Sequence, residues 1–296
     1  MQTHPRHSDA AVLARQVLGV FKLRIGFVIM ITALAGYAVA PGVGIGALQL
    51  TVLALAVLVS SASAGAFNQY VEADIDRLMR RTRGRAFVTG TLARTPAWLL
   101  LILCLLGGAV LAAWRATNAL AALYVFLGAF FYAVVYTVWL KRRTWLNIVV
   151  GGLAGSFAVL AGAAAVNPDI GAMPLLLALV LFLWTPPHFW SLAIANRDDY
   201  AAAGVPMLPV VVGSERAAWV VFYSALALVA ASLLPALFGG GMIYLAGAAS
   251  GGGYFVYKAW RLARSPGRAT AMASFFASLL QLSLLLLAAM LDAGLN

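Results

Sequence analysis

The sequence predicts an all-α, polytopic membrane protein of nine transmembrane helices. Of its 296 residues, 64% are hydrophobic and only 10% are charged, and the mean hydropathy is +0.95. Soluble domains are nearer half apolar and a quarter charged, so this composition excludes them. The second observation is a series of long apolar stretches, and the third is that the basic residues fall between alternate pairs of these stretches.

Each apolar stretch is long enough to be a membrane-spanning helix. About 17 to 25 apolar residues cross a hydrocarbon core of roughly 30 Å while every backbone amide is bonded inside the segment. Helix-stopping sequences separate the stretches, among them Pro41-Gly42, Asn167-Pro168 and Ser265-Pro266-Gly267. The predicted spans are approximately 25–40, 48–70, 97–114, 118–140, 146–166, 172–195, 217–238, 242–257 and 269–291. We therefore expect an N-terminal tail over residues 1–24 and a single transmembrane domain over residues 25–292.

The distribution of charge predicts the orientation. Nine crossings put the ends of the chain on opposite sides, and every Lys and Arg except Arg115 then falls on the side of the N-terminus. Basic loops favour the cytoplasm, so we expect a cytoplasmic N-terminus and an outside C-terminus. The net charge of +11 thus reflects membrane orientation, and no nucleic-acid partner is expected. The single Cys104 excludes a disulfide framework and a Cys-rich metal site.

Carboxylates mark two places at the predicted cytoplasmic side. A carboxylate near a bilayer is costly unless it is paired, and the chain has only nine acidic residues. Asp9, Asp169, Glu215 and Asp292 lie in the tail, in outer segments or beside a basic residue. The others follow the second and sixth spans as two clusters: Glu72, Asp74 and Asp76, then Asp198 and Asp199.

The two clusters suggest an internal repeat. Each follows an Asn at the end of an even-numbered helix, Asn68 and Asn196, four spans apart. This predicts two related halves, residues 25–140 and 146–257, followed by a ninth helix over residues 269–291.

The spacing of the first cluster predicts a metal-bridged diphosphate site. Asn68, Glu72 and Asp76 are four residues apart, so their oxygens share one face if the helix continues, and Asp74 points elsewhere. Hard oxygen ligands suit Mg²⁺, which also takes water and substrate phosphate. The following arginines, including Arg81 and Arg85, match phosphate oxygens. The alternative is that these arginines only set orientation and contact anionic lipid while the acids neutralise them, although topology needs no carboxylates.

A second motif, Trp184-Thr-Pro-Pro-His188-Phe-Trp190, lies inside the sixth span. Its two prolines remove backbone donors at membrane depth, which is tolerated beside a cavity or packed protein. From the pattern alone, His188 is either a hydrogen-bond partner of a neighbouring helix or a functional group.

Together these motifs resemble UbiA-type intramembrane prenyltransferases, and in particular the protohaem IX farnesyltransferase (haem O synthase) branch. The resemblance covers the chain from about Phe21 to the last helix. It rests on the run from Asn68 to Arg85 and on Thr185-Pro-Pro-His188 followed by Asp198-Asp199-Tyr200. Supporting matches are Lys22-Leu-Arg24, Tyr136-Thr137, Lys141-Arg142-Arg143 and Asn147-Ile148-Val-Val-Gly-Gly. Glu72 stands where many relatives have Asp, and Arg85 is followed by Ala86 where Pro is usual.

The resemblance implies a fold, a reaction and roles. The fold is a helical bundle whose cytoplasmic loops cap a central cavity, in a bacterial inner membrane. The reaction transfers farnesyl from farnesyl diphosphate to a vinyl group of haem b, giving haem O and diphosphate. It implies Mg²⁺ on Asn68, Glu72, Asp76, Asp198 and Asp199, diphosphate on Lys22, Arg81, Arg85, Lys141 and Arg142, and haem near His188, Trp184 and Trp190, with Tyr70 a further wall. Membrane lipid surrounds the protein, and a haem A synthase or a terminal-oxidase assembly factor is a candidate partner.

Two other functions fit parts of the sequence. A prenyltransferase acting on an aromatic quinone precursor would share the first motif but not the Thr-Pro-Pro-His and Asp-Asp-Tyr pair. A secondary transporter would share the two halves and the interrupted helices, but its acids are expected near the midplane and not at one face.

Overall fold

The computed structural model describes residues 7–295, and the regular elements in that range are helices. The part expected as a tail contains α1, whereas residues 1–6 lie outside the described residues. The elements in chain order are α1 (His7–Val20), α2 (Leu23–Ala38), α3 (Ala47–Val71), α4 (Ala73–Leu78), α5 (Ala86–Thr89), α6 (Pro96–Ala116), α7 (Ala119–Phe130), the π-helix η1 (Phe131–Leu140), α8 (Asn147–Gly151), α9 (Leu153–Val166), α10 (Ala172–Ala195), α11 (Arg197–Ala202), α12 (Leu208–Val212), α13 (Ser214–Leu233), the 3₁₀-helix η2 (Leu234–Phe238), α14 (Met242–Arg264) and α15 (Arg268–Leu295).

Each predicted span coincides with a helix or with two consecutive helices. Within residues 7–295, seven segments are long and apolar enough to cross a membrane, and α1 with α2 makes an eighth if that pair, bent by 42°, is one span. The expected number was nine. The difference arises at α2, which has only 16 residues, and at α14, whose last two turns carry Lys258, Arg261 and Arg264. The chain is thus a multi-pass membrane protein.

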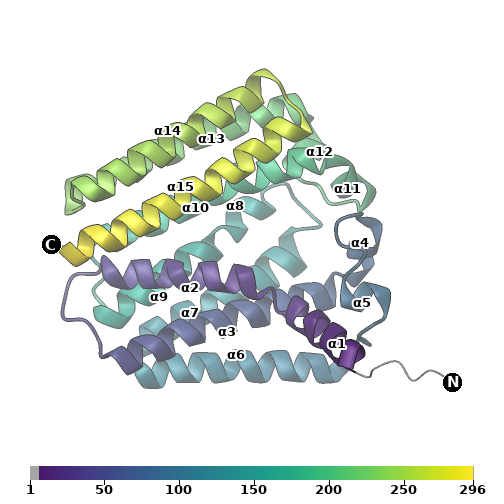
Figure 1. Ribbon diagram of the computed structural model, residues 1–296, viewed down its shortest axis with the longest axis horizontal. Coiled ribbons are helices and arrows are strands. Elements are labelled where there is room, and N and C mark those ends of the chain that lie inside the picture. The colour runs from purple at the N-terminus through teal and green to yellow at the C-terminus, as the bar shows by residue number, and fades with distance from the viewer. Residues whose placement is uncertain (1–6, 296) are drawn as a thin grey trace.

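The long helices form two groups that meet at α9 and α10. One group packs α2, α3, α6, α7 and α9 together, and the other packs α10, α13, α14 and α15. The short helices α4, α5, α11 and α12 lie at one end of the bundle beside α1, and the C-terminus lies at the other end (Figure 1). The helix α9 packs on α2 and α7 in the first group and on α10 in the second, so it joins the two groups.

Two glycines bring α2 and α9 into backbone contact. A Cβ added to Gly36 would lie 2.1 Å from the carbonyl oxygen of Val159, and one added to Gly162 would lie 1.8 Å from that of Ala33. Glycine allows such close approach of helices in membranes. This contact fixes the second half of α2 against α9.

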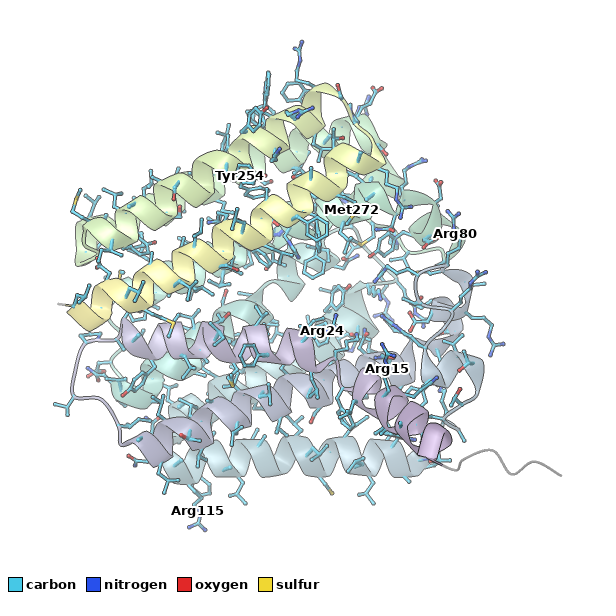
Figure 2. All side chains as sticks on the ribbon, viewed as in Figure 1. Arg15, Arg24, Arg80, Arg115, Tyr254 and Met272 are labelled. Atoms are coloured by element: carbon cyan, nitrogen blue, oxygen red, sulfur yellow. The ribbon has the colours of Figure 1, made fainter. Side chains whose placement is uncertain are left out.

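The arginines labelled in Figure 2 lie at the ends of the bundle that their positions in the sequence predict. Arg15, Arg24 and Arg80 lie toward the end that carries the short helices, and Arg115 lies at the opposite end (Figure 2). The acid clusters belong to the basic end as well, because they lie at the start of α4 and in α11.

Candidate active site

The first acid cluster lies where α3 passes into α4. The α-helix ends at Val71 instead of continuing, because Glu72 leaves helical geometry at φ −91° and ψ 10°. The backbone N–H of Glu72 still donates to Asn68 O at 3.0 Å, and that of Asp76 donates to Glu72 O at 2.8 Å. The four-residue spacing therefore survives the kink. Asn68, Glu72 and Asp76 are all buried, while Asp74 is exposed, as the spacing predicts.

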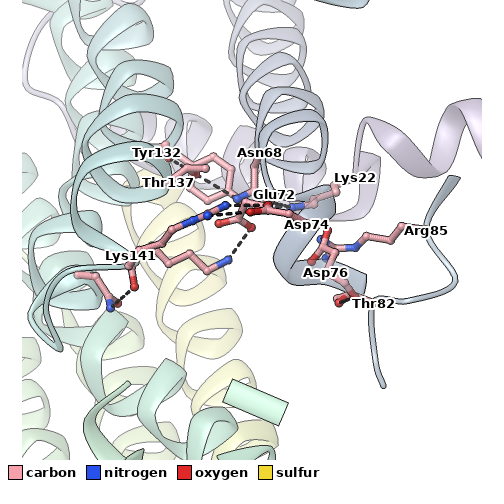
Figure 3. A network of polar contacts seen from close by, with 12 residues as sticks. Lys22, Asn68, Glu72, Asp74, Asp76, Thr82, Arg85, Tyr132, Thr137 and Lys141 are labelled. Atoms are coloured by element: carbon pink, nitrogen blue, oxygen red, sulfur yellow. Dashed lines mark hydrogen bonds and ion pairs between the residues drawn. The ribbon is translucent and has the colours of Figure 1, made fainter. Parts of the chain in front are cut away.

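Three cations from distant parts of the chain meet this cluster (Figure 3). Lys141 donates to Glu72 Oε2 at 2.5 Å, and Arg85 donates to Asp76 Oδ2 at 2.5 Å. Lys22 donates to Asn68 Oδ1 at 2.6 Å. Three of the five residues predicted to bind diphosphate are thus gathered around the predicted metal ligands. The arrangement alternates positive and negative groups in a largely buried place.

Lys22 reaches this site through an unusual backbone. Its φ of +48° lies in the left-handed region, where no other non-glycine residue among those described is found. Such strain clusters at functional sites when surrounding contacts impose it. Here Gln69 donates from Nε2 to the carbonyl oxygens of Gly19 and Val20, at 2.9 and 3.0 Å. These bonds tie the end of α1 to α3, so the turn at Lys22 is held in place.

The π-helix η1 supplies another side of the site. Tyr132 and Tyr136 stack with ring centroids 5.7 Å apart, and the Tyr132 hydroxyl accepts from Lys22 at 3.1 Å. Tyr136 packs closely on Gly151, where an added Cβ would lie 3.0 Å from its ring. The sequence patterns do not single out Tyr132, Gln69 or the contact of Thr137 with Asn68. The available signal was that all three are polar groups inside apolar spans.

The second acid cluster, Asp198 and Asp199, lies beside the loop that carries Arg80 and Arg81. Asp199 Oδ1 accepts from Arg80 Nε at 3.2 Å, and Oδ2 accepts from the Arg81 backbone N–H at 3.4 Å. Desolvation alone would raise the pKa of Asp199, but hydrogen bonds from Arg80 and Arg81 outweigh it, so the pKa lies below its usual value. Asp198 is exposed. A pocket of about 710 Å³ opens here, and its lining includes Arg80, Arg81, Asp198, Asp199 and Arg268.

Arg142 is not brought into the site. Its guanidinium makes two hydrogen bonds of 2.8 Å with Asp74, and both side chains are substantially exposed. The hydrogen bond from Arg142 holds the pKa of the Asp74 carboxyl below its usual value. The predicted diphosphate contact of Arg142 therefore has no support in its position. Tyr70, predicted as a cavity wall, instead packs on Phe87 on the other face of α3.

The predicted ligand set is only partly assembled. Among the described residues no three carboxylates, histidines or cysteines are close enough to share a metal ion. Mg²⁺ needs only one or two carboxylates when water and phosphate complete its shell. Glu72 Oε1 is buried and has no hydrogen-bond partner, so it is an unused hard oxygen at this place. The residues present therefore fit Mg²⁺ at the first cluster.

His188 lies in a seam between α10 and α15. The helix α10 continues through Pro186 and Pro187 without a break. The His188 ring stacks between Trp184 and Phe275, with centroids at 4.1 and 4.5 Å, and its Nδ1 lies 2.7 Å from Ser278 Oγ. His188 in α10 is therefore a hydrogen-bond partner of a neighbouring helix, α15, which is one of the two alternatives that its sequence pattern predicts.

Trp190 lies two residues beyond His188, about half a helical turn, and is buried as well. Its Nε1 has no hydrogen-bond partner among the described residues, and its ring lies 6.2 Å from that of Trp145. Trp184, by contrast, uses its Nε1 to donate to the carbonyl oxygen of Ser278 at 2.9 Å. Trp184 and His188 thus share Ser278 as a partner, whereas Trp190 does not.

Comparison with known proteins places this arrangement in a family. The profile of the UbiA prenyltransferase family matches residues 29–281. A protein of Paramagnetospirillum magneticum named protoheme IX farnesyltransferase 2 is 58% identical over 92% of this chain and 95% of its own. Among solved structures, a digeranylgeranylglyceryl phosphate synthase has a TM-score of 0.75 at 18% identity, over 95% of this chain and 98% of its own. A UbiA homologue from Archaeoglobus fulgidus bound to DMAPP and Mg²⁺ has a TM-score of 0.68 at 14% identity, over 90% and 98%. The chain belongs to the UbiA prenyltransferase family.

Proposed function

We propose that this protein transfers the farnesyl group of farnesyl diphosphate to a vinyl group of haem b, giving haem O and diphosphate. The observation that carries the proposal is the 58% identity, along nearly the whole length of both chains, to a relative named protoheme IX farnesyltransferase 2. The site supplies the chemistry such a transfer needs, since a buried group of acids and cations lies at the membrane surface.

The cations of the first cluster stabilise the leaving group. As the bond between farnesyl C1 and oxygen breaks, its electron pair passes to the diphosphate, whose negative charge grows. Lys22, Arg85 and Lys141 lie where fixed positive charge would oppose the cost of that growth. Asn68, Glu72, Asp76 and Asp199 would hold Mg²⁺, which would add Lewis-acid stabilisation of the diphosphate. The structure of the Archaeoglobus fulgidus homologue bound to DMAPP and Mg²⁺ supports a divalent metal in this fold.

The acceptor completes the reaction. The vinyl π electrons form the new carbon–carbon bond to farnesyl C1, and water then supplies the hydroxyl of the hydroxyethylfarnesyl side chain as it loses a proton. Water must not reach the allylic cation earlier, so the walls need to be apolar or aromatic. The stacked Tyr132 and Tyr136 rings can serve there, since aromatic faces attract cations.

His188, Trp184 and Trp190 are the proposed haem contacts. The Ser278 hydroxyl donates its one proton to Phe275 O at 2.6 Å, so it must accept from His188 Nδ1–H. The lone pair of His188 then lies on Nε2, which is the nitrogen that could meet an iron or a propionate proton. The Trp190 Nε1–H, buried without a partner, is a further donor for a propionate.

The proposal includes a cellular setting. With basic loops retained in the cytoplasm, the end that carries the short helices faces the cytoplasm of a bacterial inner membrane. The N-terminus is then cytoplasmic and the C-terminus faces outward. A haem A synthase or a terminal-oxidase assembly factor is the partner to seek by co-purification.

A single assay tests the reaction. Purified protein is incubated with farnesyl diphosphate, haem b and Mg²⁺, and haem O is detected by mass; EDTA should abolish its formation. Asp76→Asn and Asp199→Asn should each lower kcat/KM about 100-fold, because each removes a carboxylate that would hold Mg²⁺ at the leaving group. Asp74→Asn is the matched control, since Asp74 pairs at the surface with Arg142. A product formed only on a quinone precursor, or no product with any acceptor, would overturn the proposal.

A further inference from the structure

The side chain of Thr137 lies directly behind the first ligand of the candidate metal site. The Asn68 amide nitrogen Nδ2 donates to Thr137 Oγ1 over 3.0 Å, and Thr137 Oγ1 donates to the backbone oxygen of Tyr132 over 2.8 Å. Thr137 is 1% exposed and Asn68 is 3% exposed. The contact between the two side chains is therefore closed to bulk water.

The hydrogen count at Thr137 fixes which end of the Asn68 amide faces it. A hydroxyl carries one proton, and a backbone carbonyl can only accept. Since the proton of Thr137 goes to Tyr132 O, only lone pairs of Thr137 Oγ1 are turned toward Asn68. The NH₂ group must face Thr137, so Oδ1 faces away from it, where Lys22 Nζ lies 2.6 Å off.

The π-helical geometry of η1 makes this arrangement available. In an α-helix a threonine hydroxyl bonds the carbonyl three or four residues earlier, whereas Thr137 bonds the carbonyl five residues earlier. That is the spacing of a π-helix, a form frequent at functional sites. Four residues further, Lys141 follows η1 and meets Glu72, which lies four residues after Asn68. Thr137 and Lys141, four residues apart, thus contact Asn68 and Glu72, which are also four residues apart.

We propose that Thr137 is a positioning residue, which holds the Asn68 amide with its oxygen toward the site and its NH₂ away from it. A reversed amide would aim N–H groups at the Lys22 ammonium and at a metal ion, and neither can accept a hydrogen bond. The inference rests on the proposed function only for the identity of the ligand, a divalent cation with diphosphate.

Two substitutions separate the hydroxyl from the shape of the side chain. Thr137→Val keeps the volume but removes the acceptor, and Thr137→Ser keeps the hydroxyl. The readout is thermal unfolding of the full chain in detergent, titrated with Mg²⁺ at fixed inorganic diphosphate. We expect the half-saturating Mg²⁺ concentration to rise about tenfold in Thr137→Val and to stay within about twofold in Thr137→Ser. Equal behaviour of the two variants would overturn the proposal.

A double substitution tests whether Thr137 acts through Asn68. In an Asn68→Ala background no amide remains to be oriented, so adding Thr137→Val should cause no further loss of Mg²⁺-diphosphate binding or of activity. A full additional loss there would overturn the positioning role. The proposed function is tested independently of this role. If the wild-type chain makes no haem O but the Thr137 variants bind Mg²⁺ and diphosphate as expected, the proposed reaction is wrong and the role of Thr137 stands.

Discussion

The ammonium of Lys141 lies 2.5 Å from Glu72 Oε2, although 69 residues separate the two in sequence. Both residues are buried, and the other oxygen of Glu72 has no hydrogen-bond partner. A buried ion pair gains little over apolar packing, but loss of one partner leaves an uncompensated charge. Glu72 therefore depends on a cation, which is Lys141 in this structure and would be shared with Mg²⁺ in the proposed reaction.

Replacing Lys141 by Met should destabilise the protein. The buried Glu72 carboxylate loses its counter-charge, at a cost of about 3 kcal/mol. Denaturation of the purified protein without Mg²⁺ measures this cost, and Mg²⁺ with inorganic diphosphate should recover part of it. Arg142→Met is the control, because the Arg142–Asp74 pair is exposed and should contribute less than about 1 kcal/mol. Equal losses in both variants would contradict this account of Glu72.

Substitution of His188 should weaken haem binding. We expect His188→Ala to raise the haem dissociation constant tenfold or more. Ser278→Ala should raise it by up to about tenfold, because Ser278 fixes the ring tautomer. Absorbance titration with haem b measures both. Ser191→Ala is the matched control in the same seam, since Ser191 bonds Ser274 and Pro187 instead. Unchanged haem affinity in His188→Ala would leave His188 as a packing residue only.

The contact between α2 and α9 should not tolerate a methyl group. In Gly162→Ala the new Cβ would overlap the Ala33 carbonyl oxygen, so α2 and α9 must separate at this point. We expect little folded protein by size-exclusion chromatography in detergent. Gly108→Ala in α6, where nothing lies within 4 Å of the added Cβ, should behave like the wild type. Recovery of active, monodisperse Gly162→Ala protein would refute the close contact.

Asp292 connects the far ends of two helices. Its carboxylate accepts from the Gly241 N–H at 2.6 Å and from the Tyr244 N–H at 3.3 Å, at the start of α14. A carboxylate at a helix N-terminus satisfies free donors and meets the positive end of the dipole. Asp292→Ala should lower stability by about 1 kcal/mol, measured as a lower thermal midpoint. Asp169→Ala, on an exposed residue, should leave the midpoint unchanged.

Several features followed from local sequence alone. The length and hydropathy of each span indicated helices, because a membrane requires backbone bonds within the segment. The four-residue spacing of Asn68, Glu72 and Asp76 placed them on one face, and Asp74 on another, since helical periodicity is local. The segregation of the basic residues likewise needed only their order along the chain.

Other features depend on how the helices pack. Lys141 and Arg142 are neighbours in sequence, yet one enters the site and the other pairs with Asp74 at the surface. The rotation of η1 decides between them, and its π-helical form has no clear signal in residue preferences. The sequence places Asp292 in an outer segment, whereas its contact with Gly241 depends on the approach of α15 to the start of α14.

Composition, span length and motif spacing are enough to predict the membrane class, the family and the residue types of the site. The packing of the helices is needed to know which cation meets which acid, that Asn68 contacts Thr137, and that His188 contacts Ser278. The difference lies in the short range of these contacts. Hydrogen bonds and ion pairs act over about 3 Å, so their partners are set by helix rotation and crossing, which contacts such as that of Gly162 with Ala33 fix from elsewhere in the chain.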